Sequence, residues 1–286
     1  MQVVTTLSEI RSARTELQGS LGFVPTMGYL HEGHLSLVRA ARAENACVAV
    51  SIFVNPTQFG PAEDLAKYPR DLQRDLELLR SVGADLVWTP DPAEIYPGDF
   101  QTWVTVEQVT RHLEGAIRPG HFLGVTTIVA KLFNVMQPDR AYFGQKDAQQ
   151  AAVIQRMVRD LNFPIDVRVC PIVREPDGLA MSSRNIYLNP AERQAATVLS
   201  RALQSARSAY LAGERSAERL RQAALDVFQA EPLARVQYVS VADRDSLEEL
   251  ETVTHAALIS TAATVGATRL IDNLVIGEAK SSPDLP

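Results

Sequence analysis

Two histidines three residues apart, His31 and His34, are the side chains best suited to chemistry in this sequence. Gly28 and Gly33 flank them, and the apolar run 21–25 predicts a buried strand just before a helix begins. The first turn of a helix has unpartnered backbone N–H groups and the positive end of the helix dipole, so such a junction favours phosphate. At this spacing both imidazoles lie on one helical face, where they can donate hydrogen bonds to one anion.

Other interpretations of this motif remain open. Gly28 and Gly33 have the glycine spacing of a P-loop, but His34-Leu35 replaces the Lys-Ser/Thr pair, which disfavours a Walker-type kinase. The histidines could instead be half of a zinc site, or two solvated side chains at a helix start. Neither cysteine lies nearby, and Glu32 is in the wrong register for a His-Glu-x-x-His site. Phosphate chemistry is therefore the favoured hypothesis.

Composition limits the class of protein. The 286 residues carry a formal charge of -6, which disfavours a nucleic-acid partner but leaves room for a local basic pocket. We find no signal peptide and no run of eighteen uncharged apolar residues, so we expect a soluble cytoplasmic protein without a membrane partner. Cys47 and Cys170 lie in apolar runs and are expected to be buried thiols in a reducing compartment.

The elements that must position the histidines alternate between strands and helices. Further strands are predicted at 46–54, 84–88, 102–106, 140–143 and 165–170. Helices are predicted at 126–135, at 146–161 and along a buried face of Leu72, Leu76 and Leu79. This order predicts an α/β fold whose first domain, residues 1–175, holds a Rossmann-like parallel sheet. Ligands bind beyond the carboxyl ends of such strands, where Asn55, Gln58 and Lys146 are expected.

The order changes after a stretch rich in Pro, Gly and polar residues at 171–188. Asn189-Pro190 predicts the start of a long helix to about residue 211, and a second helix is expected at 216–230. Strands are predicted at 236–241, 256–262 and 268–274, and the tail 279–286 is expected to be disordered. Residues 176–286 are therefore predicted to form a smaller α+β domain.

Six segments in order resemble the pantothenate synthetase family: PTMGYLHEGH, FVNPTQF, YPRD, RPGHF, YFGQKDAQQ and MSSRNIYL. The resemblance covers most of residues 20–190 and is weaker beyond. Members of the family join pantoate to β-alanine with ATP through an enzyme-bound pantoyl adenylate and release AMP and pyrophosphate. The family shares a HIGH-like signature with class I aminoacyl-tRNA synthetases. The resemblance thus implies a Rossmann-like nucleotide- and pantoate-binding domain followed by a smaller lid domain.

The resemblance also implies roles for individual residues. His34 is implied as the catalytic proton donor to the leaving phosphate, assisted by His31, while Lys146 supplies positive charge. Gln58 and Gln150 are implied to contact pantoate, and Gln58 also β-alanine. The residues implied in ATP binding are Met27, Gly28, Tyr29, Leu30, His31, Glu32, Gly33, His34, Gly144, Gln145, Lys146, Asp147, Val173, Met181, Ser182, Ser183 and Arg184.

Simple chemistry is consistent with these assignments. Imidazole has an ordinary pKa of about 6.5 and can donate hydrogen bonds near neutral pH. A lysine at a helix start is unfavourable unless an anion is present, which favours a phosphate role for Lys146 over a solvated one. Two hydroxyls and a guanidinium at Ser182, Ser183 and Arg184 suit triphosphate oxygens, although MSSRN alone is compatible with an ordinary turn.

The resemblance further implies Mg²⁺ with the ATP and a homodimer, but no protein ligands of the metal; Asp75 is a weak candidate. Two positions depart from the family pattern: Gln145 stands where many relatives have Glu, and Tyr29 where many have Ala. Three rival functions fit the sequence less well. An adenylyltransferase that leaves AMP on its product does not explain NPTQF or QKDAQQ. A truncated tRNA synthetase would need a KMSKS-type loop, and a regulatory nucleotide binder would not need His34 and Lys146 together.

Overall fold

The computed structural model describes residues 1–61 and 63–277. The chain divides into two compact units, Met1–Val173 and a second that begins at Arg174. Among the described residues, no helix combines the length and apolar character needed to cross a membrane.

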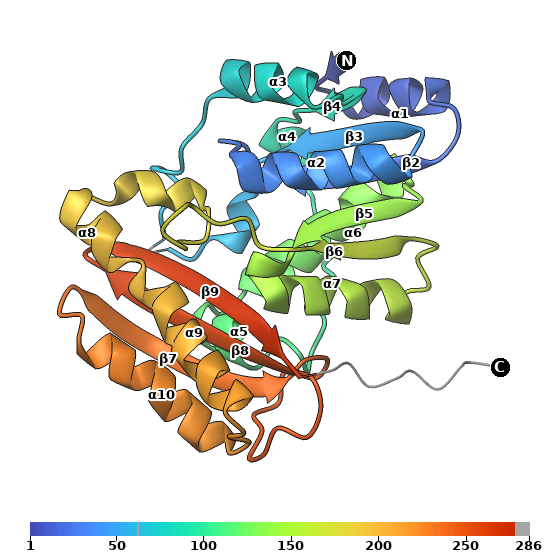
Figure 1. Ribbon diagram of the computed structural model, residues 1–286. Coiled ribbons are helices and arrows are strands. Elements are labelled where there is room, and N and C mark those ends of the chain that lie inside the picture. The colour runs from blue at the N-terminus through green and yellow to red at the C-terminus, as the bar shows by residue number, and fades with distance from the viewer. Residues whose placement is uncertain (62, 278–286) are drawn as a thin grey trace. The chain divides into compact units, whose positions relative to one another are not determined.

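The first unit is built on a six-stranded sheet in the order β1-β4-β3-β2-β5-β6, in which all neighbouring strands pair in parallel (Figure 1). The strands are β1 Gln2–Val4, β2 Leu21–Thr26, β3 Cys47–Ile52, β4 Leu86–Trp88, β5 Arg140–Gly144 and β6 Asp166–Cys170. Successive strands extend in one direction from β2 through β3 to β4, and in the other through β5 to β6. The order therefore reverses between β2 and β5, and a ligand crevice is expected beyond the carboxyl ends of these two strands.

Helices cover this sheet. They are α1 Leu7–Glu16, α2 Glu32–Glu44, α3 Leu72–Ser81, α4 Pro92–Ile95, α5 Leu113–Ile117, α6 His121–Met136 and α7 Ala148–Asp160, with 3-10 turns η1 Pro56–Gln58 and η2 Gln145–Asp147. Val38 of α2 and Leu79 of α3 pack with Val24 and Val50 in one apolar cluster. Helices α1 and α7 both contact α6, whose side chains are buried along nearly its whole length. The Rossmann-like α/β prediction is confirmed.

Three details of the first unit differ from the sequence prediction. Residues 102–106 form no strand, because Val104 is bonded to a helix instead: its N–H donates to Thr127 Oγ1 at 3.0 Å, and its carbonyl accepts from Thr126 Oγ1 at 2.6 Å. Helix α6 begins at His121, earlier than the predicted residue 126. The predicted buried face of α3 holds at Leu79 but not at Leu72, which is the first helical residue and is 46% exposed.

The two cysteines are both free and only partly buried, rather than fully buried as predicted. Cys47 Sγ lies 3.2 Å from the carbonyl oxygen of Gln18. Cys170 packs against the apolar cluster beside α2, and burial raises the pKa of its thiol. A raised pKa keeps the less nucleophilic thiol form, so nothing in the site chemistry depends on it.

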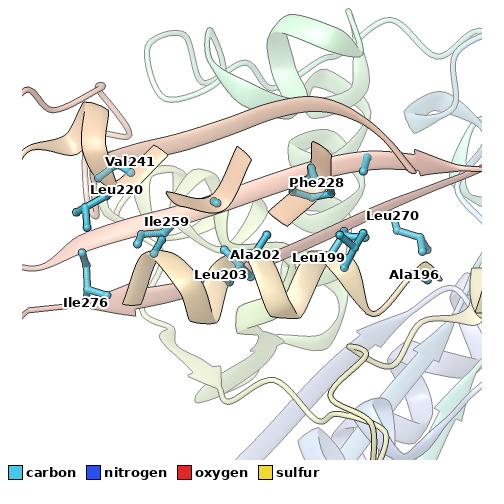
Figure 2. Close-up of a cluster of buried hydrophobic side chains, with 14 of the residues drawn as sticks. Ala196, Leu199, Ala202, Leu203, Leu220, Phe228, Val241, Ile259, Leu270 and Ile276 are labelled. Carbon is cyan, nitrogen blue, oxygen red and sulfur yellow. The ribbon is translucent and has the colours of Figure 1, made fainter. Parts of the chain in front are cut away.

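The second unit combines helices with a three-stranded antiparallel sheet in the order β7-β8-β9. Its elements are η3 Ser183–Tyr187, α8 Pro190–Ala195, α9 Val198–Leu211, α10 Ala217–Gln229, β7 Ala234–Asp243, β8 Ala257–Val265 and β9 Thr268–Ile276. Figure 2 shows Leu203 of α9, Leu220 and Phe228 of α10 and Ile259 of β8 as members of one buried apolar cluster that extends along the helices and the sheet. The smaller α+β unit is thus confirmed.

The long helix predicted from Asn189 to about Leu211 is two helices. Asn189 does cap α8, since its side chain accepts from the N–H of Glu192 and the Glu192 side chain bonds back to it. The break lies at Ala196 and Thr197, where the Thr197 hydroxyl donates to the carbonyl of Gln194 at 2.8 Å. Such a bond competes with the helical ladder. The predicted disordered tail, 279–286, lies outside the described residues.

Candidate active site

The turn between β2 and α2 carries the two histidines. His31 is the N-cap of α2, and its Nδ1 accepts a hydrogen bond from the N–H of Gly33 at 3.1 Å. His34 Nδ1 in turn accepts from the N–H of His31 at 3.3 Å. This is a reciprocal capping box, a role normally filled by Ser or Thr with Glu or Gln. It brings the two ring centroids to 4.1 Å.

These hydrogen bonds determine the protonation state of both rings. A backbone N–H can only donate, so each Nδ1 must be unprotonated and each neutral ring carries its hydrogen on Nε2. Burial, followed by the charge of Lys146, lowers the pKa of His31 to about 4. Burial, followed by His31 and Lys146, lowers the pKa of His34 well below its ordinary value. Near pH 7 both histidines are therefore neutral Nε2–H donors.

A buried carboxylate shapes the same turn. Asp75 of α3 is 1% exposed, and it accepts from the N–H groups of Tyr29 and Leu30, each at 2.7 Å. Tyr29 has a left-handed φ of 50°, and the guanidinium of Arg74 lies 5.3 Å from the centroid of its ring. Gly28 also has a positive φ, of 82°, and a Cβ there would lie 3.1 Å from Asp75 Oδ2. The turn is therefore ordered around Asp75.

Asp75 also changes the expected mode of anion binding. Successive backbone N–H groups in such a turn can cradle a phosphate, but here those of Tyr29 and Leu30 already bind the carboxylate. The N–H groups of His34 and Leu35 donate to the carbonyl of His31 at 2.8 and 3.1 Å. Most of the backbone N–H groups expected to bind an anion are thus already bonded within the turn, and the imidazole Nε2–H groups are further donors. Asp75 is likewise a poor Mg²⁺ candidate, since both its oxygens accept backbone N–H bonds.

Replacing Asp75 with asparagine should loosen this turn. The amide keeps one acceptor oxygen but turns an NH₂ group toward a backbone N–H, at a cost of about 1 to 3 kcal/mol in unfolding free energy. Because the turn holds both histidines, we also expect the turnover rate to fall about tenfold or more. Asp71→Asn is the matched control: Asp71 caps α3 by accepting from the N–H of Arg74, and asparagine caps equally well. Denaturant unfolding and initial rates that are unchanged in Asp75→Asn would contradict the positioning role.

Lys146 follows β5 and reaches the same region. It lies in η2, and β5 pairs directly with β2 through Ala141 and Phe23. Its charge lowers the pKa of both histidines. Its Nζ is 3.8 Å from Asp147 Oδ1. The carboxyl ends of β2 and β5 therefore bring together His31, His34 and Lys146, as well as the neighbouring residues Gly144, Gln145 and Asp147.

The two adjacent glutamines at the start of α7 have different surroundings. Gln149 is buried, and its Oε1 accepts from the N–H of Glu114 at 2.8 Å while its Nε2 donates to the carbonyls of Val109 and His112 at 2.9 and 2.8 Å. It therefore holds the segment before α5. Gln150 is only partly buried, which leaves it better suited to meet a ligand.

Gln58 lies near the histidine turn, as predicted from the sequence. It ends η1, is 9% exposed, and its Nε2 is 3.2 Å from the sulfur of Met27. Asn55, the cap of η1, donates from Nδ2 to Gln58 Oε1 at 3.1 Å. Met27 directly precedes the Gly28 turn, so the Gln58 amide lies beside this turn.

The remaining predicted residues lie at the end of the first unit or within the second. Val173 ends the first unit, whereas Met181, Ser182, Ser183 and Arg184 belong to the second. Within that unit, Ser182 caps η3 by accepting from the N–H of Arg184 at 3.3 Å. A bidentate pair between Arg174 and Asp272, at 2.6 and 2.9 Å, anchors the start of this segment.

The family model of pantoate-beta-alanine ligase matches residues 2–275. The chain belongs to this family. The pantothenate synthetase of Roseiflexus sp. strain RS-1 is 63% identical over 276 residues, which is 96% of this chain and 99% of that protein. The corresponding enzyme of Herpetosiphon aurantiacus is 60% identical over 277 residues, 96% of this chain and 100% of that protein. As a member of this family, the chain is a ligase of pantoate and β-alanine.

Solved structures of the pantoate-beta-alanine ligase family have the same fold. Pantothenate synthetase from Thermus thermophilus superposes with a TM-score of 0.92 at 49% identity, covering 96% of this chain and 99% of that one. The ligase from Francisella tularensis, described as complexed with β-γ ATP and β-alanine, has a TM-score of 0.79 at 34% identity, covering 96% and 97%. The resemblance inferred from six sequence motifs is thereby confirmed.

Sequence reasoning missed several residues that organise the site. Asp75 was considered only as a metal ligand, yet it orders the histidine turn. His121 and Arg118 were recognised only as part of RPGHF, yet His121 bonds the backbone carbonyl of Gln58 at 2.9 Å. The polar motif RPGH at the start of an apolar helix was a signal that these residues have a specific role. The motif does not reveal their partner, because Gln58 lies 63 residues before His121.

Proposed function

We propose that this chain condenses (R)-pantoate with β-alanine in an ATP-dependent reaction through a pantoyl adenylate, releasing AMP and pyrophosphate. Family membership supports the overall reaction. The observation that carries the chemistry is the pair of neutral histidines with Nε2–H groups beside Lys146, at the carboxyl ends of β2 and β5. This arrangement offers directed donors and one compact charge, which suit a reacting phosphate.

The proposed first step is adenylation. A pantoate carboxylate oxygen attacks the α-phosphorus of ATP, and the bond from that phosphorus to the bridging oxygen of pyrophosphate breaks. His31 and His34 donate hydrogen bonds from Nε2 to the α-phosphate and to the departing oxygen, while Lys146 offsets negative charge. In the second step the neutral amine of β-alanine attacks the activated carbonyl, AMP leaves and the amine proton passes to solvent.

The remaining assignments extend this proposal. Gln58 and Gln150 contact pantoate, and Gln58 also meets β-alanine. Residues 1–175 form the catalytic domain, and residues 176–286 form a lid. The residues proposed to bind ATP are Met27, Gly28, Tyr29, Leu30, His31, Glu32, Gly33, His34, Gly144, Gln145, Lys146, Asp147, Val173, Met181, Ser182, Ser183 and Arg184.

Mg²⁺ is proposed to enter with ATP, bound to phosphate oxygens. Among the residues described, no group of three or more His, Cys, Asp or Glu side chains is placed to hold a metal. We further propose a homodimer located in the cytoplasm. The free thiols of Cys47 and Cys170 are consistent with a reducing compartment.

Isotope exchange tests the proposed function. The protein, supplied with ATP, Mg²⁺ and pantoate but no β-alanine, should exchange labelled pyrophosphate into ATP, because adenylation is complete before the amine enters. Omitting pantoate should abolish exchange. Adding β-alanine should then give pantothenate and AMP in equal amounts.

The rival functions differ in this assay. A tRNA synthetase would need an amino acid for exchange, and an adenylyltransferase that leaves AMP on its product would release none. A regulatory nucleotide binder would exchange nothing. Pantoate-independent exchange, or ADP as product, would overturn the proposal.

A further inference from the structure

The amide of Asn55 has an unambiguous orientation. Its Oδ1 accepts from the backbone N–H of Thr57 at 3.4 Å, and its Nδ2 donates to the carbonyl of Gly124 at 3.1 Å. A backbone N–H can only donate and a carbonyl can only accept, so the two ends of the amide cannot be exchanged. The hydroxyl of Tyr96 donates to the same Oδ1 at 2.9 Å. Asn55 is 1% exposed, so water does not replace these partners.

The orientation of Asn55 determines that of Gln58. Asn55 Nδ2 donates to Gln58 Oε1 at 3.1 Å, so the NH₂ group of Gln58 must lie at the other end of its amide. There it is 3.2 Å from the sulfur of Met27, a weak acceptor. An oxygen of a substrate would be a better partner for this NH₂ group than the thioether is.

The backbone of Gln58 is held as firmly as its side-chain amide. Its carbonyl accepts from His121 Nδ1 at 2.9 Å, while His121 Nε2 lies 3.2 Å from Arg118 Nη1, which can only donate. His121 is therefore neutral with its hydrogen on Nδ1, in agreement with burial that lowers its pKa to about 4. Helix α6 also approaches η1 closely, because a Cβ at Gly124 would lie 2.5 Å from the carbonyl oxygen of Thr57. Gln58 thus has one defined position and one defined polarity.

We propose that Asn55 is a positioning residue that fixes Gln58 as a hydrogen-bond donor, so that this part of the site binds an acceptor oxygen of the acid substrate. The proposal rests on the proposed function for the identity of that acid, pantoate. The Nε2–H of Gln58 exchanges the Met27 sulfur for a pantoate oxygen, and a donor group of a substrate that faced Nε2 would meet another donor instead of an acceptor. The Thr57 N–H and the Gly124 carbonyl fix the orientation of Asn55, and Asn55 in turn fixes that of Gln58. These backbone groups therefore determine that Gln58 selects an acceptor oxygen of the substrate.

Asn55→Asp tests the proposal with little change in size. The new carboxylate can still accept from Tyr96 and Thr57, but it now presents an oxygen to Gln58. The Gln58 amide should turn over to donate to it, leaving Oε1 toward the substrate. Calorimetry should show pantoate affinity about 10- to 100-fold weaker, as expected when a buried donor is replaced by an acceptor, and ATP affinity changed less than about twofold.

Two further variants make the result decisive. Gln58→Glu keeps an oxygen for Asn55 to donate to and replaces the donor directly, so it should weaken pantoate binding at least as much. Asn45→Asp is the matched control: Asn45 is a buried asparagine before β3, where it bonds Ala41 and Tyr142, so it should alter stability but neither affinity.

Unchanged pantoate affinity in folded Asn55→Asp would overturn the inference, and so would equal losses for pantoate and ATP, which would indicate a purely structural role. If Asn55→Asp does not fold, Gln58→Glu decides alone: native pantoate affinity there overturns the inference. Failure of the proposed function is distinguishable, since the unaltered protein would then show no pantoate-dependent exchange of pyrophosphate.

Discussion

His34→Asn should lower the rate of pantoate-dependent pyrophosphate exchange roughly a hundredfold or more while the protein stays folded. Asparagine Oδ1 can take the place of Nδ1 and accept from the N–H of His31, so the helix cap is kept. The Nε2–H donor is lost, and with it the hydrogen bond to the reacting phosphate. The substitution therefore separates the catalytic role of the ring from its structural role, which alanine would not do.

The measurements are single-turnover adenylation, ATP binding by calorimetry and thermal unfolding. His112→Asn is a suitable control, because His112 is the N-cap of α5 without a side-chain cap bond, and asparagine is a favourable residue there. It should keep the native exchange rate. Near-native exchange by folded His34→Asn would refute the assignment of His34 as a donor in the transition state.

Lys146→Ala should also slow adenylation roughly a hundredfold or more, and Lys146→Gln should not restore the rate, because charge is the proposed contribution. The same variants have a second readout. Burial is the largest cause of the low His31 pKa and the charge of Lys146 is the next, so removing the charge should raise that pKa from about 4 toward its ordinary value. Imidazole NMR across an acidic-to-neutral pH series would measure the rise.

Lys67→Ala provides the control, since Lys67 is an exposed lysine in the same unit. It should leave both the adenylation rate and the His31 pKa unchanged. A Lys146→Gln enzyme as fast as the native one would show that hydrogen bonding, not charge, is the contribution of Lys146. An unchanged His31 pKa would place the ammonium group away from the rings.

Local patterns were sufficient to predict much of the first unit. The apolar runs that became β2 and β3 are continuous because both faces of a parallel strand are covered, and such runs are readable from sequence. The Asn189-Pro190 cap also predicted a helix start correctly, because a cap involves only residues that are neighbours in the sequence. The strand predicted at 102–106 was wrong because Thr126 and Thr127 satisfy its polar groups from far along the chain.

In the candidate site, too, features that depend on distant residues could not be predicted from the sequence. The proximity of His31, His34 and Lys146 could be predicted, because the carboxyl ends of parallel strands lie at the same edge of the sheet. The protonation states could not be predicted, since they depend on which N–H each Nδ1 accepts and on burial. Likewise, the Asn55–Gln58 bond is local, but its polarity is set by Gly124, which lies 69 residues after Asn55.

The carboxylate of Asp75 has a consequence for how the site meets ATP. A turn whose backbone must bind phosphate often becomes ordered only when the ligand arrives, and each residue ordered costs about 1 to 2 kcal/mol in conformational entropy. Here Tyr29 and Leu30 already bind an internal anion, and the histidines already cap their helix. That entropy is lost when the chain folds, so the affinity for ATP is not reduced by ordering this turn. In the proposed reaction, the internal anion makes this turn a rigid template for the nucleotide.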